Sequence, residues 1–260
     1  MILILVWAVS IIIAWELLAF FVHNVWKLPS AQSKLPFLHL IVMEMIKQRG
    51  TLFTQSRVTF DNSIIGFALG AFVGVGMAVL MSASKAMEHI VTPYAVASQM
   101  IPIIGLAPIV FGILHNADLS RIVMSAYVTF LPVLINVLRG FKSATPTQLE
   151  LMRIYAASSS KIFWKVKWMS ALPSLFIGLK LSAPLAVTAS IIVELMGAPD
   201  GIGVVMVSSL YYGTSQVYMF WSTVLASVGI GLLAYLSIVV IERFAAPWQP
   251  EFRKGKDGSS

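Results

Sequence analysis

The chain of 260 residues contains no cysteine and few charged residues, and both shortages restrict what it can be. Without cysteine there is no disulfide framework, no thiolate metal site and no cysteine nucleophile. Only 11% of the residues are charged, whereas 58% are hydrophobic and the mean hydropathy is +0.86. This composition is far from that of a soluble domain and is typical of a protein embedded in a bilayer.

Sequence motifs for catalysis and metal binding are missing too. The four histidines fall singly, so we predict no metal site: His23, His39, His89 and His115. The chain has no His-Glu-x-x-His, no Gly-x-Ser-x-Gly and no Gly-x-x-x-x-Gly-Lys-Ser/Thr phosphate loop. We therefore predict no catalytic residue, and ATP binding and hydrolysis of the usual kind are excluded for this chain.

Positive charge is in excess, with a net charge of +7 and a pI near 9.7. Such an excess fits nucleic-acid binding, but a membrane protein collects the same excess in its cytoplasmic loops. We read the charge as a sign of topology and expect no nucleic-acid partner.

Six stretches are long and apolar enough to span a bilayer, which takes roughly 20 mostly apolar residues. They are residues 3–23, 60–82, 90–114, 120–140, 173–197 and 218–241. The first lacks the basic start and the small-residue cleavage site of a secretory signal, so we expect it to remain as a helix. The sequence thus predicts an all-α polytopic membrane protein with six transmembrane helices, in one domain over residues 1–245.

The distribution of Lys and Arg predicts the orientation. If the amino terminus is cytoplasmic, eleven of the 18 lie in inner segments and six in outer ones, with Lys180 inside a span. This favours two cytoplasmic termini, although five of the six outer charges lie between residues 24 and 59. That segment, with an amphipathic stretch from Phe37 to Ile46, is predicted to lie on the outer membrane surface. Residues 246–260 are expected to form a disordered cytoplasmic tail.

The loop over residues 141–172 is too polar to span and carries signals for two short helices. Thr145 before Pro146 marks a helix start, and Gln148 or Glu150 completes a capping box, so one helix is expected from Pro146 to Tyr155. Ser158, Ser159 and Ser160 are expected to cap a second helix from Lys161 to Met169.

The second predicted helix has an apolar face of Ile162, Phe163 and Val166 and a basic face of Lys161 and Lys165. Two readings of this amphipathic helix remain open. It either lies in the membrane interface or inserts into a groove on a partner protein.

The spacing of three features in the loop matches a known motif. Glu150 is followed by Ala156-Ala157, and Pro173 of a Leu-Pro pair lies 23 residues after Glu150. This resembles the EAA loop of permease subunits of bacterial ABC importers, which reads Glu-Ala-Ala, three residues, glycine and, further on, Leu-Pro. Here Leu151 and Met152 replace the paired alanines. Ala156 stands where the family has the glycine that eases a left-handed turn.

Further motifs follow in the family's order and resemble its nitrate, sulfonate and taurine branch. They are Gly66-Phe67 with Gly70, Gly74 and Gly76; Ile101-Pro102 with Ala107-Pro108; Phe130-Leu-Pro132 with Asn136; and Val193-Glu-Leu-Met-Gly-Ala198 with Gly201-Ile-Gly203. With the loop, this resemblance covers residues 52–243 and identifies the chain as a member of that family.

The resemblance implies a type I importer permease in the bacterial inner membrane. It implies a second permease subunit, expected to be another copy of this chain, and cytoplasmic ATPase subunits that bind the ATP and magnesium. It also implies an extracytoplasmic solute-binding protein that delivers a small solute. The loop would couple ATPase closure to the pathway through six residues: Glu150, Ala156, Ala157, Ile162, Phe163 and Val166.

Small, polar and proline residues inside the predicted spans have local consequences. Gly66, Gly70 and Gly74 share one helix face and permit close helix packing, within one subunit or at a dimer seam. Kinks are expected at four prolines: Pro102, Pro108, Pro132 and Pro184. A translocation pathway is predicted along seven residues: Ser98, Gln99, Pro102, Ser182, Thr188, Ser190 and Glu194.

Ionisable groups at membrane depth need a partner, water or the interface. We expect Glu16 to form hydrogen bonds within the subunit and Lys180 to extend toward the inner surface. Glu194 either faces the pathway or caps the turn at Gly197–Gly203.

Two other classes of membrane protein fit the sequence less well. An ion-coupled secondary transporter would need intramembrane carboxylates and inverted repeats, and no repeat is visible. A membrane-embedded enzyme would need clustered catalytic groups, which the sequence lacks.

Overall fold

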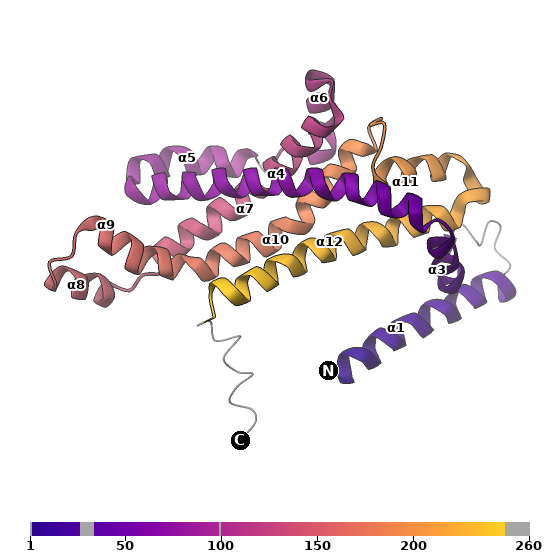
Figure 1. Cartoon of the computed structure of the whole chain (residues 1–260), viewed down its shortest axis with the longest axis horizontal. Coiled ribbons are helices and arrows are strands. Elements are labelled where there is room, and N and C mark those ends of the chain that lie inside the picture. The colour runs from indigo at the N-terminus through magenta and orange to yellow at the C-terminus, as the bar shows by residue number, and fades with distance from the viewer. Residues whose placement is uncertain (1, 27–33, 99, 248–260) are drawn as a thin grey trace.

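The computed structural model of the chain describes residues 2–26, 34–98 and 100–247, and within them every regular element is a helix. Figure 1 shows long helices running side by side, with the hairpin of α8 (Pro146–Ile154) and α9 (Ser159–Ile162) at one end of the bundle. The described part of the predicted tail, up to residue 247, continues from α12; residues 248–260 lie outside the described residues.

Four helices are each long and apolar enough to cross a membrane. They are α4 (Arg49–Ala83), α7 (Ala117–Lys142), the continuous helix Ser159–Glu194, which ends in α10 (Trp168–Glu194), and α12 (Val217–Ala245). A bent helix pair gives a fifth span if it counts as one, and the apolar helix Val9–Val25 is shorter. The described residues therefore hold four or five such spans where the sequence predicts six; five of the predicted stretches each lie mainly on one of these helices, and the third lies on the bent pair.

The third predicted span, residues 90–114, is wrong as one continuous helix. It is divided into α5 (Lys85–Ser98) and α6 (Ile103–Leu114), which bend by 95° at the break between them. Pro102 is the N-cap of α6 and has an extended backbone, with φ −66° and ψ 123°. Because proline also disfavours the helical conformation of the residue before it, Pro102 ends one helix and starts another.

The segment over residues 24–59 is not one surface segment. Its amphipathic stretch forms α3 (Leu38–Lys47), which packs on α12: Ile41 is buried, and the Ser222 hydroxyl donates to the Ile41 carbonyl at 3.3 Å. From Arg49 onward the chain already belongs to α4, which is 35 residues long. The polar residues of its first turns had concealed this extension of the span.

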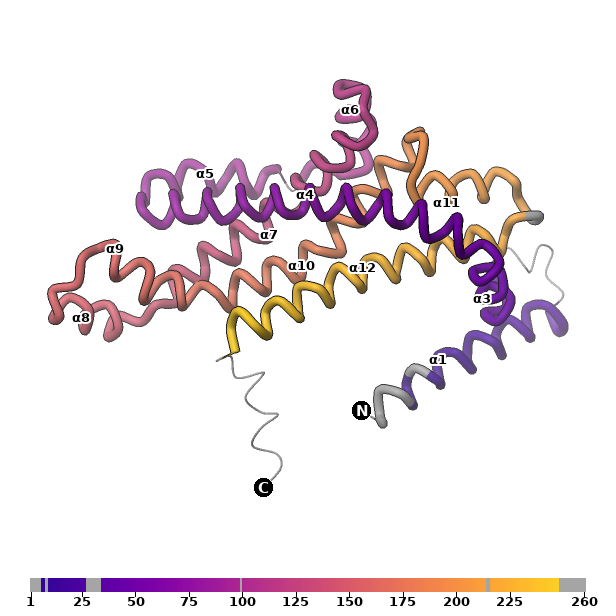
Figure 2. Tube along the Cα trace, viewed as in Figure 1, coloured from indigo at the N-terminus to yellow at the C-terminus, as the bar shows by residue number. Residues whose placement is uncertain are grey.

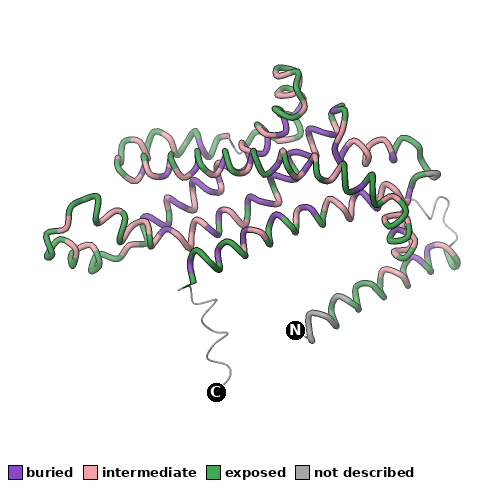
Figure 3. Tube along the Cα trace, viewed as in Figure 1, coloured by how far each residue is buried: buried purple, intermediate pink, exposed green. Residues whose placement is uncertain are grey.

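The predicted glycine face of α4 packs within the chain, against α7. A Cβ added at Gly66, Gly70 or Gly74 would lie 2.4, 2.3 or 2.7 Å from a carbonyl oxygen of α7. The two backbones thus approach as closely as the small-residue pattern predicts. In Figure 3 buried positions concentrate on α7 and α10, whereas the α8–α9 hairpin is mostly exposed.

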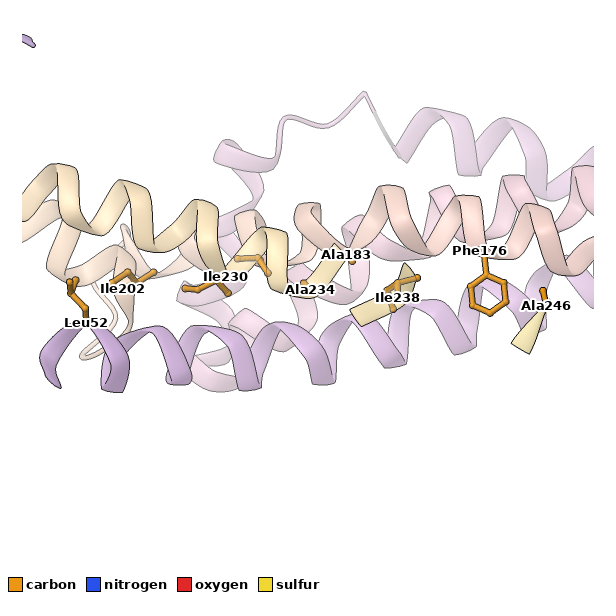
Figure 4. Close-up of a cluster of buried hydrophobic side chains, with 9 residues drawn as sticks. Leu52, Phe176, Ala183, Ile202, Ile230, Ala234, Ile238 and Ala246 are labelled. Atoms are coloured by element: carbon orange, nitrogen blue, oxygen red, sulfur yellow. The ribbon is translucent and has the colours of Figure 1, made fainter. Parts of the chain in front are cut away.

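A second apolar contact joins α10, α12 and the first turn of α4. Phe176 and Ala183 of α10 meet Ile230 and Ile238 of α12, and Leu52 closes one end, as Figure 4 shows. Between membrane-spanning helices such a contact is stabilised by close packing, because lipid tails are as apolar as the side chains themselves.

The first helix leaves the bundle. Figure 2 shows α1 (Ile2–Phe20), continued by the π-helical turn η1 (Phe21–Val25), meeting the other helices near α3. Trp15 donates to the Pro36 carbonyl at 2.9 Å and stacks edge-on against Trp221 of α12. Glu16 Oε1 accepts from the His39 backbone amide at 3.0 Å, which confirms the predicted hydrogen bond within the subunit.

Lys180 reaches toward the carboxyl-terminal end of α12, in the predicted direction, and meets a carboxylate there. Its Nζ lies 2.9 Å from Glu242 Oε2, so α10 and α12 are joined by an ion pair whose carboxylate is buried. Glu242 lies in the last turn of α12, one residue beyond the predicted span 218–241. A buried cation costs less free energy when it is paired with an opposite charge than when it is left without one.

Candidate functional site

The hairpin within residues 141–172 is built on a helix with both ends capped. At the start of α8 the Thr145 hydroxyl accepts from the Gln148 amide at 3.3 Å, and Gln148 Oε1 accepts from the Thr145 amide at 3.1 Å. The predicted capping box is confirmed, with Gln148 rather than Glu150 as its second member.

A left-handed turn ends α8. Ala156 has φ +48°, its amide donates to the Arg153 carbonyl at 2.9 Å, and the Ala157 amide donates to the Met152 carbonyl at 3.0 Å. These two bonds form a Schellman motif. The turn therefore forms here although alanine occupies the position where the related motif has glycine.

Replacing Ala156 with glycine should stabilise this turn by about 0.5–1 kcal/mol, because glycine relieves the left-handed strain at a smaller entropic cost. Hydrogen exchange of the Ala156 and Ala157 amides would measure it, and exchange should slow by about two- to fivefold. The matched control is Ala157→Gly, which should leave exchange unchanged or faster. Equal exchange in Ala156→Gly and the wild type would contradict the strain at this position.

The second helix of the loop is not a separate element. Ser158 caps it, accepting from the Lys161 amide at 3.4 Å, but the helix begins at Ser159 and runs through the π-helical turn η2 (Phe163–Lys167) into α10. The whole helix, Ser159–Glu194, has 36 residues. A movement of the hairpin would consequently act directly on a membrane-spanning helix.

The six predicted coupling residues fall into two groups. Glu150 and Ala156 are exposed and Ala157 is half-buried in the turn, whereas Ile162, Phe163 and Val166 are half-buried at the base of the hairpin. Phe163 packs on the chain's own Phe141, with ring centroids 5.5 Å apart. Its ring therefore anchors the hairpin to the bundle.

A cluster of exposed apolar side chains lies on α8, and not on the predicted apolar face of the second helix. Leu151, Ile154 and Tyr155 are 52, 79 and 75% exposed. Their spacing of three and four residues puts them on one helix face. That spacing is readable in the sequence, but only the second helix combines an apolar face with a basic one.

At the opposite end of α7 lies an ionic cluster, which we call the Arg121 cluster: the buried Arg121 and Glu194, the exposed Asp118 and the partly exposed Asp200. The Arg121 side chain is fully buried, and its nitrogens lie 2.6 Å from Asp118 Oδ1, 2.6 Å from Asp200 Oδ1 and 3.2 Å from Glu194 Oε1. By sequence position Arg121 is the sixth of the predicted outer charges, but the structure buries it.

Glu194 in turn holds the start of α11 (Ile202–Tyr211). Its Oε2 accepts from the Gly203 amide at 2.8 Å and its Oε1 accepts from the Thr59 hydroxyl at 2.8 Å, while Thr59 Oγ1 accepts from the Ile202 amide at 3.0 Å. A Cβ at Gly201 would lie 2.2 Å from the Glu194 carboxyl carbon. Of the two readings of Glu194, the geometry matches the one that caps this turn.

The predicted pathway residues do not share one exposed surface of the single chain. Ser182 and Ser190 are fully buried like Glu194, whereas Thr188 and Pro102 are exposed. The Ser98 hydroxyl donates to the Ala95 carbonyl at 2.8 Å, and Gln99 lies outside the described residues. Thr188 lines a groove of about 430 Å³ between α10 and α12. A pathway role for the exposed residues stays a prediction.

Comparison with known proteins identifies the family. A family profile described as "binding-protein-dependent transport system inner membrane component" matches residues 66–246. The chain belongs to this family. This match confirms the prediction, made from the loop and the motifs around it, that the chain is an inner membrane component of a transport system.

Individual relatives are also named as transport permeases. Formylaminopyrimidine transport permease protein ThiX of Halalkalibacterium halodurans is 29% identical over 245 residues, 92% of each chain. Putative aliphatic sulfonates transport permease protein SsuC of Bacillus subtilis is 24% identical, over 78% of this chain and 73% of that protein. A solved structure titled as an amino acid ABC transporter with histidines matches with a TM-score of 0.63 at 16% identity, covering 77% of this inner membrane component and 97% of the solved chain. The two share a fold.

Proposed function

We propose that this chain is the permease subunit of an ATP-driven ABC importer in the bacterial inner membrane. Two copies would form the translocation pathway, with the 141–172 loop and both termini in the cytoplasm. Two ATPase subunits that bind ATP and magnesium would supply the energy, and a solute-binding protein would deliver the solute from outside. The family and the membrane-spanning helices support this assignment.

The exposed apolar face of α8 is the observation that carries the proposal. Leu151, Ile154 and Tyr155 present three large side chains on a capped helix at one end of the bundle, and the chain's own core does not cover them. A cluster of this kind in a soluble loop marks a protein contact. We assign it to the ATPase.

Rigid-body transfer would pass the movement of the ATPase to the pathway. The hairpin is anchored by Phe163 against Phe141 and continues into α10 without a break. Closure of the ATPase dimer would draw the two hairpins together and tilt α10, which turns the cavity outward. Hydrolysis would reset it.

The proposed solute is a small molecule of the kinds for which the relatives are named. These names include a formylaminopyrimidine, aliphatic sulfonates, bicarbonate, nitrate and taurine. Specificity would reside largely in the binding protein.

Ion coupling is not needed to explain the intramembrane charges. Lys180 pairs with Glu242, and Glu194 pairs with Arg121 and caps α11. These groups are satisfied by structural partners, whereas a secondary transporter would leave a carboxylate free to exchange ions.

Purification of the chain from its native membrane in mild detergent, followed by mass spectrometry, tests the proposal. A P-loop ATPase should be recovered in equal amount to the permease, and the reconstituted complex with its binding protein should take up solute only with ATP. Recovery without an ATPase, from membranes that preserve other transporter complexes, would contradict it.

A further inference from the structure

A groove separates the hairpin from the last turn of α4. It encloses about 440 Å³ and is lined by Val79 and Ser82 of α4 and by Arg153, Ile162, Phe163 and Lys167 of the hairpin and its continuation. Because the apolar run of α4 ends here, the groove lies at the level where hydrocarbon gives way to headgroups.

The groove is positively charged. Arg153 and Lys167 line it, and no aspartate or glutamate does. Neither cation forms an ion pair within the described parts of the chain, whereas Lys142 nearby in the sequence pairs with Glu88. Two cations without a carboxylate leave room for an anionic ligand, and each basic residue near a membrane surface adds about 1 kcal/mol of attraction to anionic lipid.

The walls of the groove are apolar where they come from Val79, Ile162 and Phe163. Beside it Trp164 is 57% exposed and stacks against Trp168, with ring centroids 5.6 Å apart. Exposed tryptophan is characteristic of the headgroup level of a membrane. Apolar walls, two cations and a tryptophan pair together fit an amphiphile with an anionic head.

We propose that this groove binds an anionic phospholipid, with the phosphate between Arg153 and Lys167 and an acyl chain along Val79 and Phe163. The lipid fills the space between the hairpin and α4, so it holds the hairpin at a fixed height above the membrane. The proposal goes beyond the proposed function, since it requires the cytoplasmic membrane surface but neither a particular solute nor an ATPase.

The test is native mass spectrometry of the intact purified transporter with added phosphatidylglycerol or phosphatidylcholine. The wild type should retain phosphatidylglycerol in preference, and the double variant Arg153→Gln/Lys167→Gln should retain at least about tenfold less. The matched control is Lys161→Gln/Lys165→Gln, which removes two exposed charges from the same segment and should retain the lipid like the wild type.

Three outcomes would overturn the proposal. They are equal retention of both lipids, equal losses in the two double variants, and binding of inorganic phosphate that lipid does not displace. A second measurement needs no variant. Phosphatidylglycerol with a photoactivatable acyl chain should label wild-type peptides that contain residues 79–83 or 153–167. Labelling confined to other segments would also overturn it.

Discussion

Replacing Arg121 with leucine should lower the free energy of unfolding by up to about 3–5 kcal/mol, because Glu194 is then buried without a cation and must either stay charged or take up a proton, each at a cost in free energy. Folded proteins are stable by only about 5–15 kcal/mol. The loss is a large fraction of that stability, so the yield of folded transporter in the membrane should fall. The yield of folded complex and its thermal unfolding midpoint would measure the effect.

Two further variants separate the cluster from a general effect of charge. Arg57→Leu is the matched control, since Arg57 is 72% exposed and lies 3.4 Å from Asp61, a pair worth less than about 1 kcal/mol. Adding Glu194→Gln to Arg121→Leu should recover about 1 kcal/mol, because the amide is neutral, although its single oxygen can accept from only one of Thr59 and Gly203. If Arg121→Leu were as stable as Arg57→Leu, the structural role of the cluster would be refuted.

Replacing Ile154 with aspartate should weaken binding of the ATPase by about 30-fold or more. A central apolar residue of an interface contributes about 2 kcal/mol or more, and each 1.4 kcal/mol is tenfold in affinity. Because Ile154 is 79% exposed in the single chain, the change should leave membrane insertion and folding intact. ATPase retention during purification and ATP-driven uptake would both fall.

Ile154→Leu is the matched control for that variant, since it keeps the apolar volume and should bind the ATPase normally. Phe163→Asp gives a different pattern: its ring packs on Phe141, so the variant should also lose loop stability. Wild-type binding and uptake in Ile154→Asp would show that the face of α8 is not the contact.

Features with a local signal could be predicted from the sequence. The Thr145–Gln148 capping box follows from four adjacent residues, and the α4–α7 contact follows from glycines four residues apart. The apolar stretches marked the membrane-spanning helices because composition alone decides which segments enter a bilayer.

Features that depend on distant partners could not be predicted in this way. Lys180 and Glu242 are 62 residues apart in the chain, and Arg121 and Asp200 are 79 apart. No local pattern joins them, so neither cation could be matched with its partner from the sequence. Hydropathy also could not show that Pro102 divides one apolar run into two helices at 95°.

Site-specific crosslinking tests the central claim most directly, because the chain has no cysteine and one introduced thiol is unique. Tyr155→Cys places it at the exposed end of α8, and Tyr211→Cys, 86% exposed at the end of α11, serves as the control. In native membranes a thiol-to-amine crosslinker should join Tyr155→Cys, and not Tyr211→Cys, to a P-loop ATPase. Absence of that product at position 155, or equal products at both positions, would contradict a permease driven through this loop.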